Sequence, residues 1–74
     1  MTKTIYSEEH KYTVEQLKKA RHDSNMDQLA VAKSLNKTQS YISKIESGQR
    51  RIDIVELKKF SRLYKKPIKY FLKP

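Results

Sequence analysis

Hydrogen-bonding side chains dominate the segment between residues 39 and 44. They are Gln39, Ser40, Tyr41, Ser43 and Lys44, interrupted only by Ile42. These amide, hydroxyl and ammonium groups donate and accept hydrogen bonds, but none of them stands beside a base that could make it a nucleophile. The chemistry available here is recognition of a hydrogen-bonding partner. The alternative is an exposed polar helix face without a ligand.

The rest of the sequence offers no catalytic or metal-binding set. Cysteine is absent, which excludes a disulfide and a thiolate metal site. His10 and His22 would lie ~18 Å apart on one helix, too far to share a metal ion. The single glycine, Gly48, excludes a glycine-rich phosphate loop, and no paired carboxylates stand near a base. We therefore expect a protein that is not an enzyme and binds no cofactor.

Positive charge is concentrated in the second part of the chain. Seventeen Lys and Arg residues against eight Asp and Glu residues give a net charge of +9. Residues 1–27 contain five charges of each sign, so the whole excess lies in residues 28–74. Such an asymmetry in a small protein indicates a polyanionic partner such as nucleic acid. The alternative is a basic surface that is merely solvated.

At 74 residues the chain forms one small domain, and its composition favours helices. Glycine occurs once and proline twice, too few for the turns of a strand-rich fold. No apolar run approaches the ~18 residues of a membrane span. The N-terminus also lacks the apolar stretch of a signal peptide, so we expect a cytoplasmic protein that does not contact a membrane.

Capping residues predict an all-α fold, a compact five-helix bundle. The first helix has two possible starts, Ser7 and Thr13, and the apolar spacing that runs through both favours Ser7. Residues 1–12 are then an N-terminal extension that runs into the first helix, and residues 13–74 are the domain. The five predicted helices cover residues 7–22, 28–35, 39–47, 54–65 and 68–72.

The segment 28–47 has the spacing of a helix-turn-helix. Two short helices joined by a three-residue turn cross closely, and Ala32 is the small residue that this crossing requires. Asn36 suits the positive φ that the turn needs. Ile42 and Ile45 face inward from the second helix and leave its polar side chains outside. In such a motif the second helix can enter the major groove of DNA.

On these residues, the stretch from about Val14 to Leu72 resembles the Cro/repressor-type (XRE-like) helix-turn-helix family. The matching motifs are Leu17-Lys-Lys-Ala-Arg21, Gln28-Leu-Ala-Val-Ala32, Tyr41-Ile-Ser-Lys-Ile-Glu46-Ser-Gly48-Gln-Arg50 and Leu57-Lys-Lys-Phe60. The sequence departs from the family pattern at Asn36, Lys37 and Ile52, where glycine, an apolar residue and proline are usual.

The resemblance implies a role for each polar group. It places base-reading side chains at Gln39, Ser40, Tyr41 and Lys44, and phosphate-contacting groups at Gln28, Ser43, Arg50 and Arg51. The Gln28 amide is also expected to brace Gln39. Arg21 and Glu46 are expected to form a structural ion pair between the first helix and the end of the recognition helix.

The function that the resemblance implies is sequence-specific binding of double-stranded DNA by a transcriptional regulator. Repression by a small, weak homodimer on a palindromic operator fits best. Its interface is expected near Ile54, Val55, Lys58, Tyr70 and Leu72.

Two other functions remain open. The first is an antitoxin-type or restriction–modification controller protein, whose DNA binding is coupled to a protein partner such as a toxin or an antirepressor. The second is a basic amphipathic module for acidic membranes. The absence of a broad apolar stripe on the recognition helix argues against the membrane module.

Overall fold

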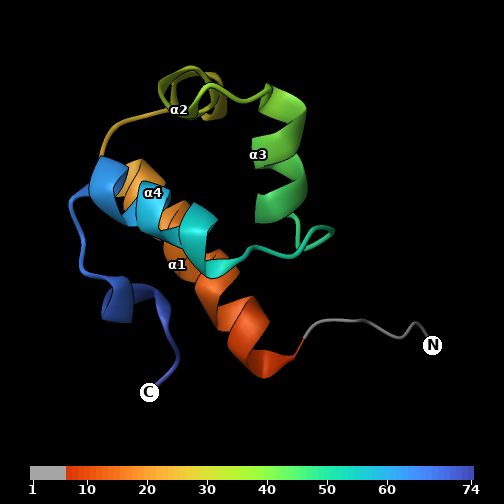
Figure 1. Ribbon diagram of the computed structural model, residues 1–74, viewed down its shortest axis with the longest axis vertical. Coiled ribbons are helices and arrows are strands. Elements are labelled where there is room, and N and C mark those ends of the chain that lie inside the picture. Colours follow the sequence, from red (N-terminus) through yellow and green to blue (C-terminus); the bar gives the residue numbers. More distant parts are fainter. Residues whose placement is uncertain (1–6) are drawn as a thin grey trace.

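The computed structural model describes residues 7–74, which are all-helical and form no strand (Figure 1). The elements are α1 (Glu8–Asp23), α2 (Gln28–Leu35), α3 (Gln39–Glu46), α4 (Ile54–Tyr64) and the 3-10 helix η1 (Ile68–Phe71). The all-α prediction is confirmed, but the expected count of five α-helices is wrong. The last segment is too short for an α-helix, and the Tyr70 N–H donates to the Pro67 carbonyl, which is the tighter 3-10 pattern.

Each α-helix begins where a side-chain oxygen accepts a hydrogen bond from the first turn. Ser7 caps α1, Asp27 caps α2, Thr38 caps α3 and Asp53 caps α4. The α1 helix therefore uses the Ser7 start. Thr13 lies inside that helix, where its buried hydroxyl donates to the Phe71 carbonyl oxygen at 2.6 Å.

Left-handed residues close the turns on both sides of α3. Asn36 has φ of 59° after α2, and Gly48 has φ of 82° after α3. Lys65 takes the same conformation after α4, with φ of 58°. The ends differ from the sequence prediction by one residue: α1 ends at Asp23, α3 at Glu46 and α4 at Tyr64. Helix ends vary by this much because their last turn is weakly hydrogen-bonded.

The helices form two groups that meet at the core. Figure 1 shows α4 crossing α1, with η1 beside α1, while α2 and α3 sit together at the other end. α3 also packs against α1, so the first helix connects the two groups. No helix within the described range is long and apolar enough to cross a membrane.

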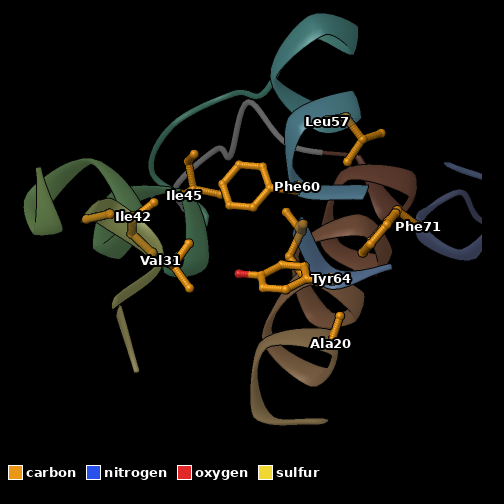
Figure 2. Close-up of a cluster of buried hydrophobic side chains, with 10 residues drawn as sticks. Ala20, Val31, Ile42, Ile45, Leu57, Phe60, Tyr64 and Phe71 are labelled. Carbon is orange, nitrogen blue, oxygen red and sulfur yellow. The ribbon is translucent and has the colours of Figure 1, made fainter. Parts of the chain in front are cut away.

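The core is built from one or more side chains of every element (Figure 2). Its largest fully buried members are Phe60, Phe71, Leu17, Ile42, Ile45 and Val31. Tyr64 is also buried, and its hydroxyl has no hydrogen-bond partner among the described residues. Burial raises the pKa of this phenol above its ordinary value.

Candidate nucleic-acid interface

The outward face of α3 is polar and open to solvent. Ile42 and Ile45 are 0% and 1% exposed and anchor the helix in the core. The residues on the other side that are exposed are Gln39, Ser40, Ser43 and Lys44. Three predicted base-reading residues and one predicted phosphate contact therefore share one accessible surface. This division follows from the helical spacing, since Ile42 and Ile45 are three positions apart.

The crossing of α2 and α3 fixes this surface. Ala32 is 1% exposed where the helices pack. The Lys37 N–H donates to the Ala32 carbonyl at 2.8 Å, which closes the turn after α2 with Asn36 in the left-handed conformation. Ala32 is thus buried and α2 packs against α3, both as the sequence predicted.

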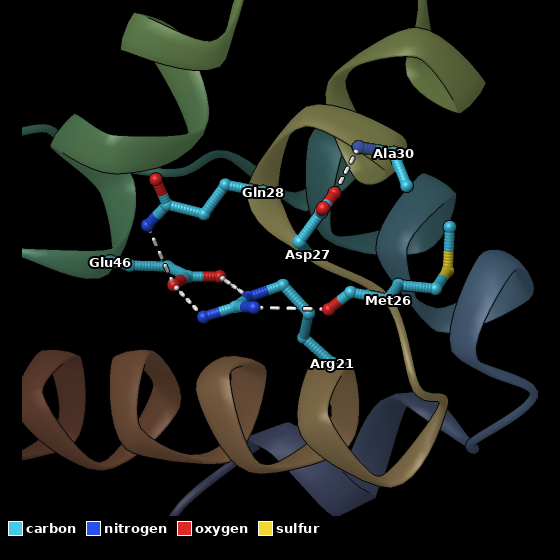
Figure 3. A network of polar contacts seen from close by, with 6 residues as sticks. All are labelled: Arg21, Met26, Asp27, Gln28, Ala30 and Glu46. Atoms are coloured by element: carbon cyan, nitrogen blue, oxygen red, sulfur yellow. Dashed lines mark hydrogen bonds and ion pairs between the residues drawn. The ribbon is translucent and has the colours of Figure 1, made fainter.

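A polar network ties α1 to the end of α3 (Figure 3). Arg21 donates from Nε and Nη2 to the two carboxylate oxygens of Glu46, at 2.8 and 3.0 Å. Arg21 Nη1 also donates to the Met26 carbonyl at 3.0 Å. The hydrogen bonds from Arg21 to Glu46 raise the pKa of the guanidinium above its ordinary value. The structure thus brings together the two residues expected to form the structural ion pair.

Gln28 joins that network, which differs from its expected role. Its amide Nε2 donates to Glu46 Oε1 at 3.1 Å, so the expectation that this amide braces Gln39 is wrong. A carboxylate is a stronger acceptor than a neutral amide, and Glu46 lies within reach of the first turn of α2. The Gln28 backbone N–H, at the start of that helix, is the group left for an anion.

Tyr41 is the predicted base reader that the structure places differently from the rest. It is half-buried at the edge of α3, and its hydroxyl donates to Glu56 Oε2. The Arg50 guanidinium lies over its ring, 4.7 Å from the centroid. Burial and the hydrogen bond to Glu56 raise the pKa of the phenol to about 12.

The loop after α3 carries the two predicted phosphate-binding arginines, both exposed. Arg50 Nη2 donates to Glu56 Oε2 at 3.1 Å, and its side chain is 45% exposed. Burial alone would raise the pKa of Glu56, but the hydrogen bonds from Tyr41, the Asp53 backbone and Arg50 hold it below its ordinary value. The sequence analysis did not identify Glu56 as a partner of Tyr41, a contact that joins α4 to α3.

The residues expected at a dimer interface include three exposed large apolar side chains. Ile54, Val55 and Leu72 are 57%, 59% and 46% exposed. Ile54 and Leu72 line one shallow pocket, and Tyr70 and Leu72 line a second, so Leu72 lies between the other two, while Val55 lines neither pocket. Lys58 is exposed one turn further along α4. We call Ile54, Val55, Tyr70 and Leu72 the apolar surface.

Solved structures with the same fold come from an epoxidase. The chain superposes on Fe(II)-HppE with an alternative substrate at a TM-score of 0.83 and 21% identity, covering 93% of this chain and 36% of that one. Hydroxypropylphosphonic acid epoxidase from S. wedmorenis gives 0.81 and 22%, covering 89% and 35%. The chain thus spans little more than a third of these structures, and at this identity the likeness shows the fold alone. No curated protein matches the chain.

A protein-family comparison identifies the chain directly. The helix-turn-helix family model matches residues 8–71, which includes every described helix. The match begins at Glu8, the first residue of α1. It covers the crossing at Ala32, the turn at Asn36 and the polar face of α3 together. The chain therefore belongs to the Cro/repressor-type (XRE-like) helix-turn-helix family.

Proposed function

We propose that this protein is a transcriptional repressor that binds a palindromic operator in double-stranded DNA as a small homodimer. The observation that carries the proposal is the two-sided character of α3. Ile42 and Ile45 hold one side in the core, and exposed hydrogen-bonding side chains cover the other. A helix anchored in this way can enter the major groove without losing its support.

The proposed recognition separates base contacts from backbone contacts. Gln39, at the first turn of α3, can donate from its amide N–H to adenine N7 and accept from the adenine N6 amino group through its amide oxygen. Arg50, Arg51 and the Gln28 backbone N–H would meet phosphates on either side of the groove. The charge excess in residues 28–74 supports this arrangement, because those residues include α3 and the following loop.

Two arguments support a dimer: the number of base pairs needed to specify one operator, and the exposed side chains of the apolar surface. One recognition helix reads only a few base pairs, and two half-sites ~34 Å apart provide a longer site. Exposed Ile54, Val55 and Leu72 are candidates for burial between two copies. A bound dimer would repress by occluding a promoter.

Selection of bound sites from random duplex DNA tests this function. The expected result is an enriched inverted repeat whose half-sites lie one helical turn apart. A reporter with that site inside its promoter should then lose expression when the protein is present. Enrichment of no sequence would contradict specific binding, and increased expression would contradict repression.

The apolar surface also favours a second candidate, in which a different protein covers it. An antitoxin-type or controller protein would use Ile54, Val55 and Leu72 to bind a toxin or an antirepressor while α3 binds DNA. Sedimentation of the purified protein with its selected site separates the two. Two copies per palindrome support the homodimer, whereas one copy per site, with a second protein recovered from the host, supports the alternative.

A further inference from the structure

Two cations lie over the ring of Tyr41. The Lys37 Nζ atom is 4.9 Å from the ring centroid, and the Arg50 guanidinium carbon is 4.7 Å from it. Lys37 belongs to the turn before α3, and Arg50 belongs to the loop after it. The ring therefore brings two positive charges together beside the recognition helix, although one residue precedes that helix and the other follows it. Both distances are within the range of an attractive cation–π contact.

The position of the ring is itself fixed from α4. The Tyr41 hydroxyl donates to Glu56 Oε2, and Arg50 Nη2 donates to the same oxygen at 3.1 Å. The other carboxylate oxygen of Glu56 accepts from the Asp53 N–H at 3.2 Å as part of the capping box of α4. Glu56 is thus held at the helix start and holds both Tyr41 and Arg50.

This arrangement leaves the cations available to a ligand. The Arg50 side chain is 45% exposed, whereas that of Glu56 is only 17% exposed. A guanidinium has five N–H donors, and Arg50 Nη2 uses one of them for its hydrogen bond to Glu56. Lys37 is exposed as well. The Glu56 carboxylate therefore holds Arg50 from the less exposed side, and the side of the cluster that faces solvent is positive.

We propose that Lys37 and Arg50, positioned by Tyr41 and Glu56, form a clamp for the phosphate backbone of DNA beside α3. In this role Tyr41 is a positioning residue and reads no base. The inference rests on the proposed DNA binding; it adds Lys37 to the phosphate contacts and makes Tyr41 and Glu56 the residues that position the two cations. Holding the cations in place before binding lowers the ordering cost of the complex.

The clamp has a signature that a base contact lacks. Each neutralised phosphate contributes about 0.9 to the slope of log K against log salt concentration. Tyr41→Leu removes no charge, yet it should lower that slope by about 0.9 per protomer, because Lys37 and Arg50 lose their platform. A base-reading tyrosine would change operator affinity and leave the slope unchanged.

The experiment measures binding of the full-length protein to its selected operator and to a random duplex at several salt concentrations. Tyr41→Phe keeps the ring and should retain most of the slope. Tyr41→Leu should lose affinity for both duplexes, by about tenfold, and should have no further effect once Lys37 and Arg50 are both alanine. Lys19→Ala, which removes an exposed lysine of α1, is the control for loss of one charge.

A measurement on the free protein keeps the test decisive if Tyr41→Leu fails to fold. Ring currents should shift the NMR signals of the Lys37 ε-protons and the Arg50 δ-protons upfield in the unaltered protein. Unshifted signals, or a Tyr41→Leu slope equal to that of the unaltered protein, would overturn the clamp. Shifted signals in a protein that binds no duplex would instead refute the proposed DNA function and leave the cluster as a purely structural contact.

Discussion

Arg21 meets Glu46 side-on, with Nε 2.8 Å from one carboxylate oxygen and Nη2 3.0 Å from the other. The two side chains are 11% and 5% exposed, so the contact is shielded from solvent. Arg21 lies on α1, and Glu46 is the last residue of α3. The orientation of the recognition helix therefore depends on a residue outside the helix-turn-helix motif.

Removing one partner of this pair should destabilise the fold strongly. Arg21→Met leaves a buried carboxylate with only the Gln28 amide, and such a loss costs about 3–5 kcal/mol. Denaturant unfolding of Arg21→Met, Glu46→Gln and the double variant should give a coupling of about 1–3 kcal/mol. Additive effects of the two substitutions would show that the pair does not act as a unit.

Tyr64→Phe is expected to stabilise the protein. The Tyr64 hydroxyl is buried without a hydrogen-bond partner, and such a group carries a desolvation cost of about 1–3 kcal/mol. Removing it should raise the melting temperature by several degrees, at roughly 4–8 °C per kcal/mol for a domain of this size. Tyr41→Phe is the matched control, since it removes a hydroxyl that donates to Glu56 and should lower the melting temperature.

Gln39 and Arg50 should give opposite binding phenotypes. Gln39→Ala should weaken operator binding by roughly 5- to 150-fold, from ~1–3 kcal/mol of base discrimination, and leave random-sequence binding almost unchanged. Arg50→Ala should weaken both duplexes alike and lower the salt slope by ~0.9 per half-site. Equal losses on both duplexes for Gln39→Ala would mean that Gln39 does not read a base.

The apolar surface should control assembly on DNA. Val55 is 59% exposed, so Val55→Gln should leave the melting temperature nearly unchanged while reducing dimer formation on the operator. Leu29→Gln is the control, because Leu29 is similarly exposed, at 47%, but lies on α2. Sedimentation should show two copies per site for the control and fewer for Val55→Gln. Two copies for both variants would place the interface elsewhere.

Acid should weaken the Glu56 contacts in a defined direction. The folded pKa of Glu56 is below its ordinary value of 4.5, so its contribution to stability is fully present above pH 4.5 and is lost as pH falls through the folded pKa. Between about pH 5 and acid unfolding, the free energy of unfolding of Glu56→Gln should therefore fall less steeply with pH than that of the unaltered protein. Identical pH profiles in urea unfolding would contradict this role.

Local signals explain why the helix-turn-helix was predictable from sequence. Asp27 and Thr38 cap their helices through hydrogen bonds to residues three positions away, and Asn36 takes its positive φ within the turn itself. Such contacts depend on neighbouring residues only. The Arg21–Glu46 pair spans 25 positions, and it was predicted from the family resemblance rather than from local pattern.

Tertiary placement explains what the sequence did not predict. Tyr41 lies on α3 and Glu56 on α4, and no helical period joins positions 15 apart in two different helices. Gln28 contacts Glu46 over 18 positions for the same reason. The sequence also did not predict that η1 is a 3-10 helix. The segment has only four residues and packs against α1, and segments this short are commonly 3-10 helices whatever their residue types.

The hydrogen bond from Thr13 to the Phe71 carbonyl spans 58 positions and joins the first helix to the last element. Helices of eight residues, such as α2 and α3, are not stable in water without tertiary support. That support includes Phe71, which is 0% exposed. Proteolysis that removes Phe71 from the C-terminal end would therefore unfold the domain cooperatively. The proposed DNA binding would then be lost, although every residue of the recognition helix would still be present.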